Sequence, residues 1–225
     1  MCKIKYKFNN SIAYGTGFFL IQNNFKYLVT CYHVIPENLN IKSIELEIAY
    51  PKNINEILDL KNRDIQFLKE PIDIAIIQIK DEDLEIMDNV SFMTFNGNYR
   101  YKQNDYKNAE ILVMGYPKGK KIVSENGKIV EINENEFEHN ASTDRGSSGS
   151  PIFLSSTSEI IGVHKSSNIK KNLNLGIFID VILNKLKCIN INKNKHSKNS
   201  KLKNKKLERI KKKNHQKKKK MKKRK

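Results

Sequence analysis

The sequence predicts an all-β protein with a short C-terminal helix and a disordered basic tail, and three observations carry this prediction. Short runs of β-branched and aromatic residues recur between Gly, Asn, Asp and Pro turn signals. Helix signals are few, and the net positive charge is confined to the residues after 188. Strands at this spacing indicate a β-sandwich or β-barrels. The expected strands are 17–22, 26–33, 43–50, 72–79, 111–114, 128–132, 151–154, 159–164 and 175–179.

Two strands of the N-terminal half carry a polar residue at one end. The first runs from Tyr27 and ends in a histidine, His33, and the apolar second strand has one carboxylate, Asp73, near its start. Each residue alone is more often structural, because a strand-end histidine is commonly a hydrogen-bonded core residue and Asp is common where a strand begins. Together they offer an imidazole and a carboxylate, which a nucleophilic serine requires.

The run GSSGSPIF at residues 146–153 supplies the candidate serine. Gly146 and Gly149 have no Cβ and can adopt positive φ, so the turn can direct backbone N–H groups toward a point beside the Ser148 hydroxyl. Such runs also occur in ordinary turns. Serine is a weak nucleophile unless an imidazole takes its proton and a carboxylate orients that imidazole. His33, Asp73 and Ser148 come in a usable order and predict this chemistry.

The C-terminal helix is expected over residues 181–188. Asp180 can cap it, and its apolar face consists of Ile182, Leu183 and Leu186. The first 188 residues are long enough to bury a substantial core, and no stretch is apolar enough to span a membrane. We therefore expect one domain over residues 1–188 and a separate tail over residues 189–225.

The tail carries the whole net charge of the chain. Residues 189–225 hold nineteen Lys or Arg and one acid, Glu208, so they account for the +18 of the full sequence, and residues 1–188 balance. With few large apolar side chains the tail is expected to be disordered. Its charge predicts sequence-independent, salt-dependent binding of nucleic acid. The alternatives are that the tail binds an anionic membrane or that it is merely solvated. The candidate polyanion-binding residues are Lys211, Lys212, Lys213, Lys217, Lys218, Lys219, Lys220, Lys222, Lys223 and Arg224.

Further segments make a family resemblance visible. The His, Asp, Ser order resembles the trypsin-like serine peptidases, and the C-terminal half resembles their glutamyl endopeptidase branch. The segments that carry it are ILVMGYPKG (111–119), GKIV (127–130), STDRGSSGSPIF (142–153), EIIGVH (159–164) and GIFID (176–180). The resemblance covers residues 13–187. It implies two six-stranded antiparallel β-barrels of the chymotrypsin type, over about 1–95 and 109–179, joined by the polar segment 96–108.

The resemblance also implies roles for individual residues. His33 would be the general base, Asp73 its orienting carboxylate and Ser148 the nucleophile, while the backbone N–H groups of Gly146 and Ser148 would form the oxyanion hole. In glutamyl endopeptidases a threonine before the nucleophile and a histidine on the following strand bind the acidic side chain of the substrate. Those positions are Thr143 and His164 here, and Ser142 stands where trypsin-type enzymes carry an aspartate. The resemblance implies cleavage after Glu or Asp.

Cysteine and histidine usage bears on disulfide bonds, cellular location and metal binding. Cys2, Cys31 and Cys188 form an odd set without a disulfide framework, and the N-terminus lacks the apolar core of a signal peptide. An intracellular protein is expected, whether nuclear, nucleolar or associated with a virion. The five histidines show no metal-ligand spacing, so neither a metal nor another cofactor is expected.

The sequence thus predicts a monomeric serine endopeptidase that acts on polypeptides and is held near polyanions by its tail. The alternative is a trypsin-fold protein that has lost catalysis and binds nucleic acid or protein partners. Reactivity of Ser148 would distinguish the two.

Overall fold

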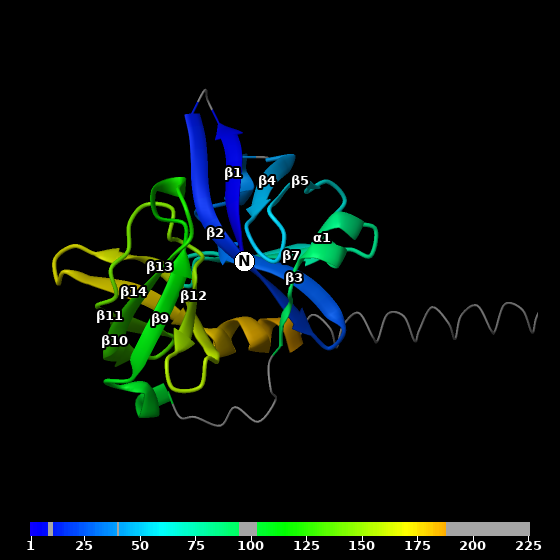
Figure 1. Cartoon of the computed structure of the whole chain (residues 1–225). Helices are drawn as coiled ribbons and strands as arrows, with labels where there is room; N and C mark the ends of the chain where they lie inside the picture. The colour runs from blue at the N-terminus through cyan, green and yellow to red at the C-terminus, as the bar shows by residue number, and fades with distance from the viewer. Residues whose placement is uncertain (9–10, 40, 95–102, 188–225) are drawn as a thin grey trace, which may run out of the picture. The chain divides into compact units, whose positions relative to one another are not determined.

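The computed structural model describes residues 1–8, 11–39, 41–94 and 103–187 (Figure 1). These residues are mostly strands, so the prediction of an all-β protein is confirmed. The tail, Cys188 and most of the connecting segment 96–108 lie outside the described residues. Among the residues that the structure describes, no helix has the length and apolar composition needed to cross a membrane.

The N-terminal half forms one sheet, whose strands follow the order β5-β4-β1-β2-β3-β7-β6, with β8 paired in parallel to β2. This half therefore differs from the expected six-stranded barrel, because its sheet has eight strands, seven of them on a path that does not close within the described residues. The strands are β1 (Cys2–Phe8), β2 (Ser11–Gln22), β3 (Phe25–Cys31), β4 (Ser43–Ile48), β5 (Ile54–Asp59), β6 (Ile65–Leu68), β7 (Ile74–Ile79) and β8 (Met93–Thr94).

Hydrophobic patterning explains how this sheet packs. Ile44, Leu46 and Ile48 alternate with polar residues along β4 and are buried, as expected for a strand with one solvated face. β7 is a nearly continuous apolar run, and all but Gln78 of its residues are buried. The three buried residues of β4 join one core cluster with Ile77 and Ile79 of β7 and Ile4 of β1.

The C-terminal half is a closed barrel of six strands, in the order β10-β11-β14-β13-β12-β9. Phe137 lies at its centre, fully buried, with its ring centroid 4.7 Å from that of Phe178. Gly162 and Gly176 leave room for this ring, because a Cβ at either position would lie 2.7 Å or less from it. The strands are β9 (Glu110–Gly115), β10 (Val123–Asn133), β11 (Glu136–His139), β12 (Pro151–Leu154), β13 (Ile160–Asn168) and β14 (Leu173–Phe178).

Helical segments are short. They comprise the α-helix α1 (Leu84–Asn89) and three 3₁₀ turns, η1 (Glu37–Leu39), η2 (Gln103–Tyr106) and η3 (Pro117–Gly119). Residues 179–187 are also helical, so the helix expected over 181–188 is present but begins two residues earlier. Asp180 consequently lies inside its first turn and not at the position before it.

Five strands were not predicted from the sequence: β1, β5, β6, β8 and β11. In β1, Cys2, Ile4 and Tyr6 alternate with lysines and are buried, so its period of two was a signal that could have been used. The other four are short, and two of them, β5 and β11, carry acidic residues that weaken the apolar pattern.

Candidate active site

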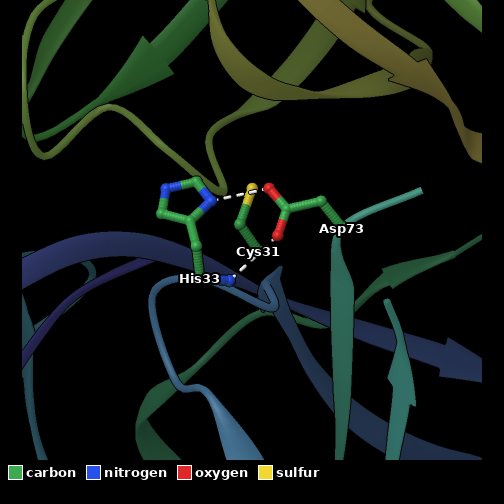
Figure 2. Close-up of side chains that lie close together, drawn as sticks. All are labelled: Cys31, His33 and Asp73. Atoms are coloured by element: carbon green, nitrogen blue, oxygen red, sulfur yellow. Dashed lines mark hydrogen bonds and ion pairs between the residues drawn. The ribbon is translucent and has the colours of Figure 1, made fainter. Parts of the chain in front are cut away.

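His33 and Asp73 are joined by two hydrogen bonds (Figure 2). The His33 backbone N–H donates to Asp73 Oδ1 at 2.9 Å, and His33 Nδ1 lies 2.6 Å from Asp73 Oδ2. Because an ionised carboxylate can only accept, Nδ1 carries the proton and Nε2 is left as the acceptor. Asp73 is buried, whereas 48% of the His33 side chain is exposed. The ring is thus oriented from inside the protein and accessible from outside.

Local turns place this pair. β3 ends at Cys31, two residues before the expected end, and His33 lies in the turn that follows. The Tyr32 N–H donates to the Asp73 carbonyl at 3.0 Å, which joins this turn to the start of β7. Asp73 has a φ of +62°. A non-glycine residue in this region costs about 1 kcal/mol, so the surrounding turn holds Asp73 against a local preference.

Lys165 of β13 tethers that turn from the C-terminal barrel. Its ammonium donates to the Pro71 carbonyl and pairs with Glu70 at 3.0 Å and Glu136 at 2.9 Å. Burial opposes the charge, but the hydrogen bonds to Glu136 and Glu70 prevail and hold the pKa of Lys165 above its usual value. Lys165 therefore connects the two halves of the chain beside Asp73.

Cys31 lies against the same pair (Figure 2). Its Sγ, a ring nitrogen of His33 and a carboxylate oxygen of Asp73 all lie within 4.8 Å of one another, a spacing that could hold a metal ion. The thiol is a poor ligand, however, because burial raises its pKa well above the usual value and the charge of Asp73 adds to this. Its Sγ instead donates to the His164 carbonyl at 3.3 Å.

Ser148 lies in a turn over residues 145–149, the serine turn, which is anchored to the N-terminal sheet. The Thr16 N–H donates to the Ser148 carbonyl at 2.9 Å, and the Thr16 hydroxyl donates to the Gly146 carbonyl at 2.8 Å. The Gly149 N–H donates to the His164 carbonyl, the same atom that accepts from Cys31. Ser148 therefore lies near the His33–Asp73 pair, although no hydrogen bond joins Ser148 to His33 within the described part of the chain.

The conformation of this turn leaves two amides free. Gly146 and Gly149 have φ values of +93° and +88°, as the glycine-framed pattern predicted. In the described ranges neither the Gly146 nor the Ser148 N–H donates a hydrogen bond. The Arg145 carbonyl accepts from the Lys118 N–H at 2.5 Å. Because a trans peptide points its carbonyl and N–H in opposite directions, the Gly146 N–H is directed away from Lys118.

A family model described as a trypsin-like peptidase domain matches residues 15–163, a range that includes His33, Asp73 and Ser148. The chain belongs to the trypsin-like peptidase family. The trypsin-like part of the predicted resemblance is thus confirmed, while the glutamyl endopeptidase branch remains a prediction.

Solved structures support the fold of this peptidase domain. A serine endoprotease from Yersinia pestis is 15% identical with a TM-score of 0.61, and the match covers 80% of this chain. The chain spans 59% of the length of that structure. The Rv3671c protein of M. tuberculosis, in an inactive serine-to-alanine mutant, is 14% identical with a TM-score of 0.56 and coverages of 84% and 86%. At these identities the likeness concerns the fold alone.

Two of the three residues predicted to bind an acidic substrate side chain line the same cavity. Ser142 and Thr143 line a cavity of about 790 Å³, whose wall includes Lys118, Lys120 and Lys121. His164 is not part of this lining and is buried in the barrel with 3% exposure. The Thr143 hydroxyl is buried and has no hydrogen-bond partner among the described residues. Any contribution of His164 to substrate binding would require the pocket to extend into the barrel.

His139 is a neighbour of His164 that sequence reasoning missed. His139 Nε2 and His164 Nδ1 lie 3.4 Å apart, and both rings are buried. Burial lowers the pKa of His139 to about 4 and that of His164 to about 3, the latter helped by His139 and His33. Phe137 and His139 are two residues apart on β11 and fully buried, so recognising this strand would have predicted an inward-facing histidine.

The two buried histidines predict acid-sensitive stability. In the unfolded chain a histidine has a pKa near 6.5, so below that pH the unfolded state binds more protons than the folded state. The free energy of unfolding should fall as the pH drops from 7 to 5, by up to about 2 kcal/mol for each histidine. Urea unfolding of the wild type and of His139→Phe at both pH values measures this.

The difference between the two proteins isolates the histidine, because the carboxylates common to both cancel. The variant should lose about 2 kcal/mol less than the wild type on going to pH 5. An equal loss in both proteins would show that His139 is not held neutral in the folded chain.

Proposed function

We propose that this chain is a serine endopeptidase in which His33 is the general base, Asp73 orients it and Ser148 is the nucleophile. The pair of hydrogen bonds from His33 to Asp73 supports this most strongly, since they fix both the backbone and the tautomer of the histidine. Family membership adds support, because the matched range contains all three residues.

In the proposed reaction, Ser148 Oγ attacks the carbonyl carbon of a substrate peptide while His33 Nε2 takes the hydroxyl proton. Asp73 stabilises the resulting imidazolium through the Nδ1–H bond. The oxyanion accepts hydrogen bonds from the N–H groups of Gly146 and Ser148. Collapse of the tetrahedral intermediate breaks the C–N bond, and His33 returns the proton to the leaving amine. Water then hydrolyses the acyl-enzyme with His33 again acting as base.

The proposed cleavage site follows a Glu residue, or Asp. The unpartnered Thr143 hydroxyl supports this, because it can donate to a substrate carboxylate. The cavity that Ser142 and Thr143 line also holds Lys120 and Lys121, against one acid, Glu125, and its other two lysines are paired with Glu47 and Asp144. His164 would contribute a hydrogen bond and not a charge, since its lowered pKa keeps it neutral.

The test of the nucleophile compares the wild type with Ser148→Ala. The wild type should cleave members of a diverse peptide library after Glu and should be labelled by a fluorophosphonate probe. Both activities should be lost in Ser148→Ala. Ser147→Ala is the matched control, because Ser147 is the neighbouring hydroxyl and is buried in the same turn. Probe labelling must survive in that control.

The outcomes separate the parts of the proposal. Cleavage at other residues would retain the three catalytic residues and reject the acidic-side-chain pocket. A folded wild type that neither cleaves nor labels would instead favour the alternative, a trypsin-fold protein that binds nucleic acid or protein partners.

Gly146→Ala should be nearly as damaging as loss of the nucleophile. A Cβ at Gly146 would lie 2.6 Å from the Tyr116 carbonyl oxygen, and the φ of +93° is unfavourable for alanine. The peptide must therefore shift, which removes one oxyanion donor and should lower kcat by about 10²- to 10³-fold. Steady-state kinetics on the best library peptide measures this.

Gly127→Ala provides the control for Gly146→Ala. Its Cβ would lie 2.4 Å from the Ala141 backbone nitrogen in the same barrel, so it introduces a comparable clash away from the serine turn. At a temperature where both variants are folded, Gly127→Ala should retain most of its kcat. Equal losses would attribute the effect to a damaged barrel and not to the oxyanion donor.

The tail over residues 189–225 is proposed to tether the peptidase domain to nucleic acid. Its charge supports this, because nineteen Lys or Arg follow residue 188 and the preceding residues are balanced. Replacing the ten basic residues of 211–213, 217–220 and 222–224 with Gln in the full chain should weaken duplex binding and flatten its dependence on salt. A salt titration by fluorescence anisotropy measures both; unchanged binding would reject the tether.

A further inference from the structure

Lys3 of β1 connects the N-terminal sheet to the C-terminal barrel. Its side chain is buried, with the residue 8% exposed. Its ammonium pairs with Glu47 Oε2 of the neighbouring strand at 2.6 Å and donates to the Gly119 carbonyl at 3.0 Å. The second bond spans 116 residues and reaches a turn, η3, that belongs to the other half. A buried cation shared in this way fixes the η3 turn relative to β1.

The η3 turn packs directly on the backbone of the serine turn. The Lys118 N–H holds the Arg145 carbonyl, and the absent Cβ of Gly146 would lie 3.0 Å from the Gly119 nitrogen. Lys118 and Gly119 have φ values of +57° and +63°, so the turn has an uncommon conformation that requires outside support. A displacement of η3 would therefore move the Arg145–Gly146 peptide.

The orientation of that peptide decides what faces the substrate. With its carbonyl on Lys118, its N–H points the other way and can donate to an oxyanion. If the Lys118 contact is lost, the peptide can rotate and direct its carbonyl toward the same position. A carbonyl oxygen there would repel the developing negative charge.

Thr16, the residue opposite Lys3 on β2, also helps to hold the η3 turn and the serine turn in position. Lys3 and Thr16 are register partners on β1 and β2. The Thr16 hydroxyl donates to the Gly146 carbonyl at 2.8 Å and accepts from the Tyr116 N–H at 3.0 Å. Thr16 thus bonds to the serine turn at Gly146 and to Tyr116 before the η3 turn, while Lys3 bonds to Gly119 at the end of that turn.

We infer that Lys3 is a positioning residue for the oxyanion hole, which it holds through Gly119, Lys118 and the Arg145–Gly146 peptide. This inference rests on the proposed peptidase function. It concerns kcat, because the peptide that Lys3 orients contacts the oxyanion that forms in the transition state.

Lys3→Met should lower kcat by about 10- to 100-fold, since a displaced donor costs less than a deleted one. KM is measured separately, because Lys3 also lines the cavity that Ser142 and Thr143 line. Lys3→Arg should recover much of the loss, because a guanidinium can also bridge Glu47 and Gly119. Lys5→Met is the matched control: Lys5 lies two residues along β1 and pairs with Glu45 at 3.2 Å and Glu47 at 3.8 Å, and within the described chain it makes no bond to η3. It should keep kcat within about twofold of the wild type.

Hydrogen exchange at the Lys118 amide supplies a readout that does not depend on turnover. This amide donates to Arg145, so its protection should drop in Lys3→Met and remain in Lys5→Met. If Lys3→Met does not fold, Lys3→Gln replaces it, because its side chain is one bond shorter and cannot reach Gly119 in the same way.

The outcomes distinguish this inference from the proposed function. An active wild type whose kcat is equally affected by Lys3→Met and Lys5→Met overturns the inference alone. An inactive wild type rejects the proposed function, and the exchange experiment then decides the inference: unchanged protection of Lys118 in Lys3→Met overturns it, and selective loss supports the positioning of the Arg145–Gly146 peptide.

Discussion

The hydrogen bonds of Thr16 are the interaction on which the arrangement of the site depends. This fully buried residue bonds to Gly146, Ser148 and Tyr116 of the barrel, and its carbonyl accepts from the Thr30 hydroxyl of the sheet. A net contribution of about 1 kcal/mol per bond is modest, but burying any of these groups without a partner costs about 1–3 kcal/mol. The serine turn is therefore held in place mainly because every alternative leaves polar groups unpaired.

Local chemistry made part of the fold and site predictable. The β-branched run of β7 and the alternation of apolar and polar residues in β4 predict strands even when the neighbouring strands are not known. Gly146 and Gly149 predicted backbone positions with positive φ, because glycine alone adopts positive φ freely. Asp73 could be paired with His33 because their chemistry is complementary, although the distance between them becomes visible only in the folded chain.

Long-range contacts between polar residues could not be predicted in the same way. Lys3 and Lys165 look like ordinary surface lysines in the sequence, yet both are buried and reach across to the other half. His139 lies in a strand too short and too acidic to recognise. In each case the residue type suggests solvent, and only the tertiary partners explain its burial.

Because of Lys3 and Lys165, each half of the chain depends on the other half to hold one of its turns in place. Lys3 of the sheet supports the turn beside Gly146, and Lys165 of the barrel supports the turn that carries Asp73. Neither half therefore contains all the supports of its own proposed catalytic segment. A chimaera that joins one half of this chain to the complementary half of a distant relative would inherit the proposed catalytic side chains without their supports. Residues such as Lys3 and the 117–119 turn should accordingly change together during evolution, as a unit that crosses the boundary between the halves.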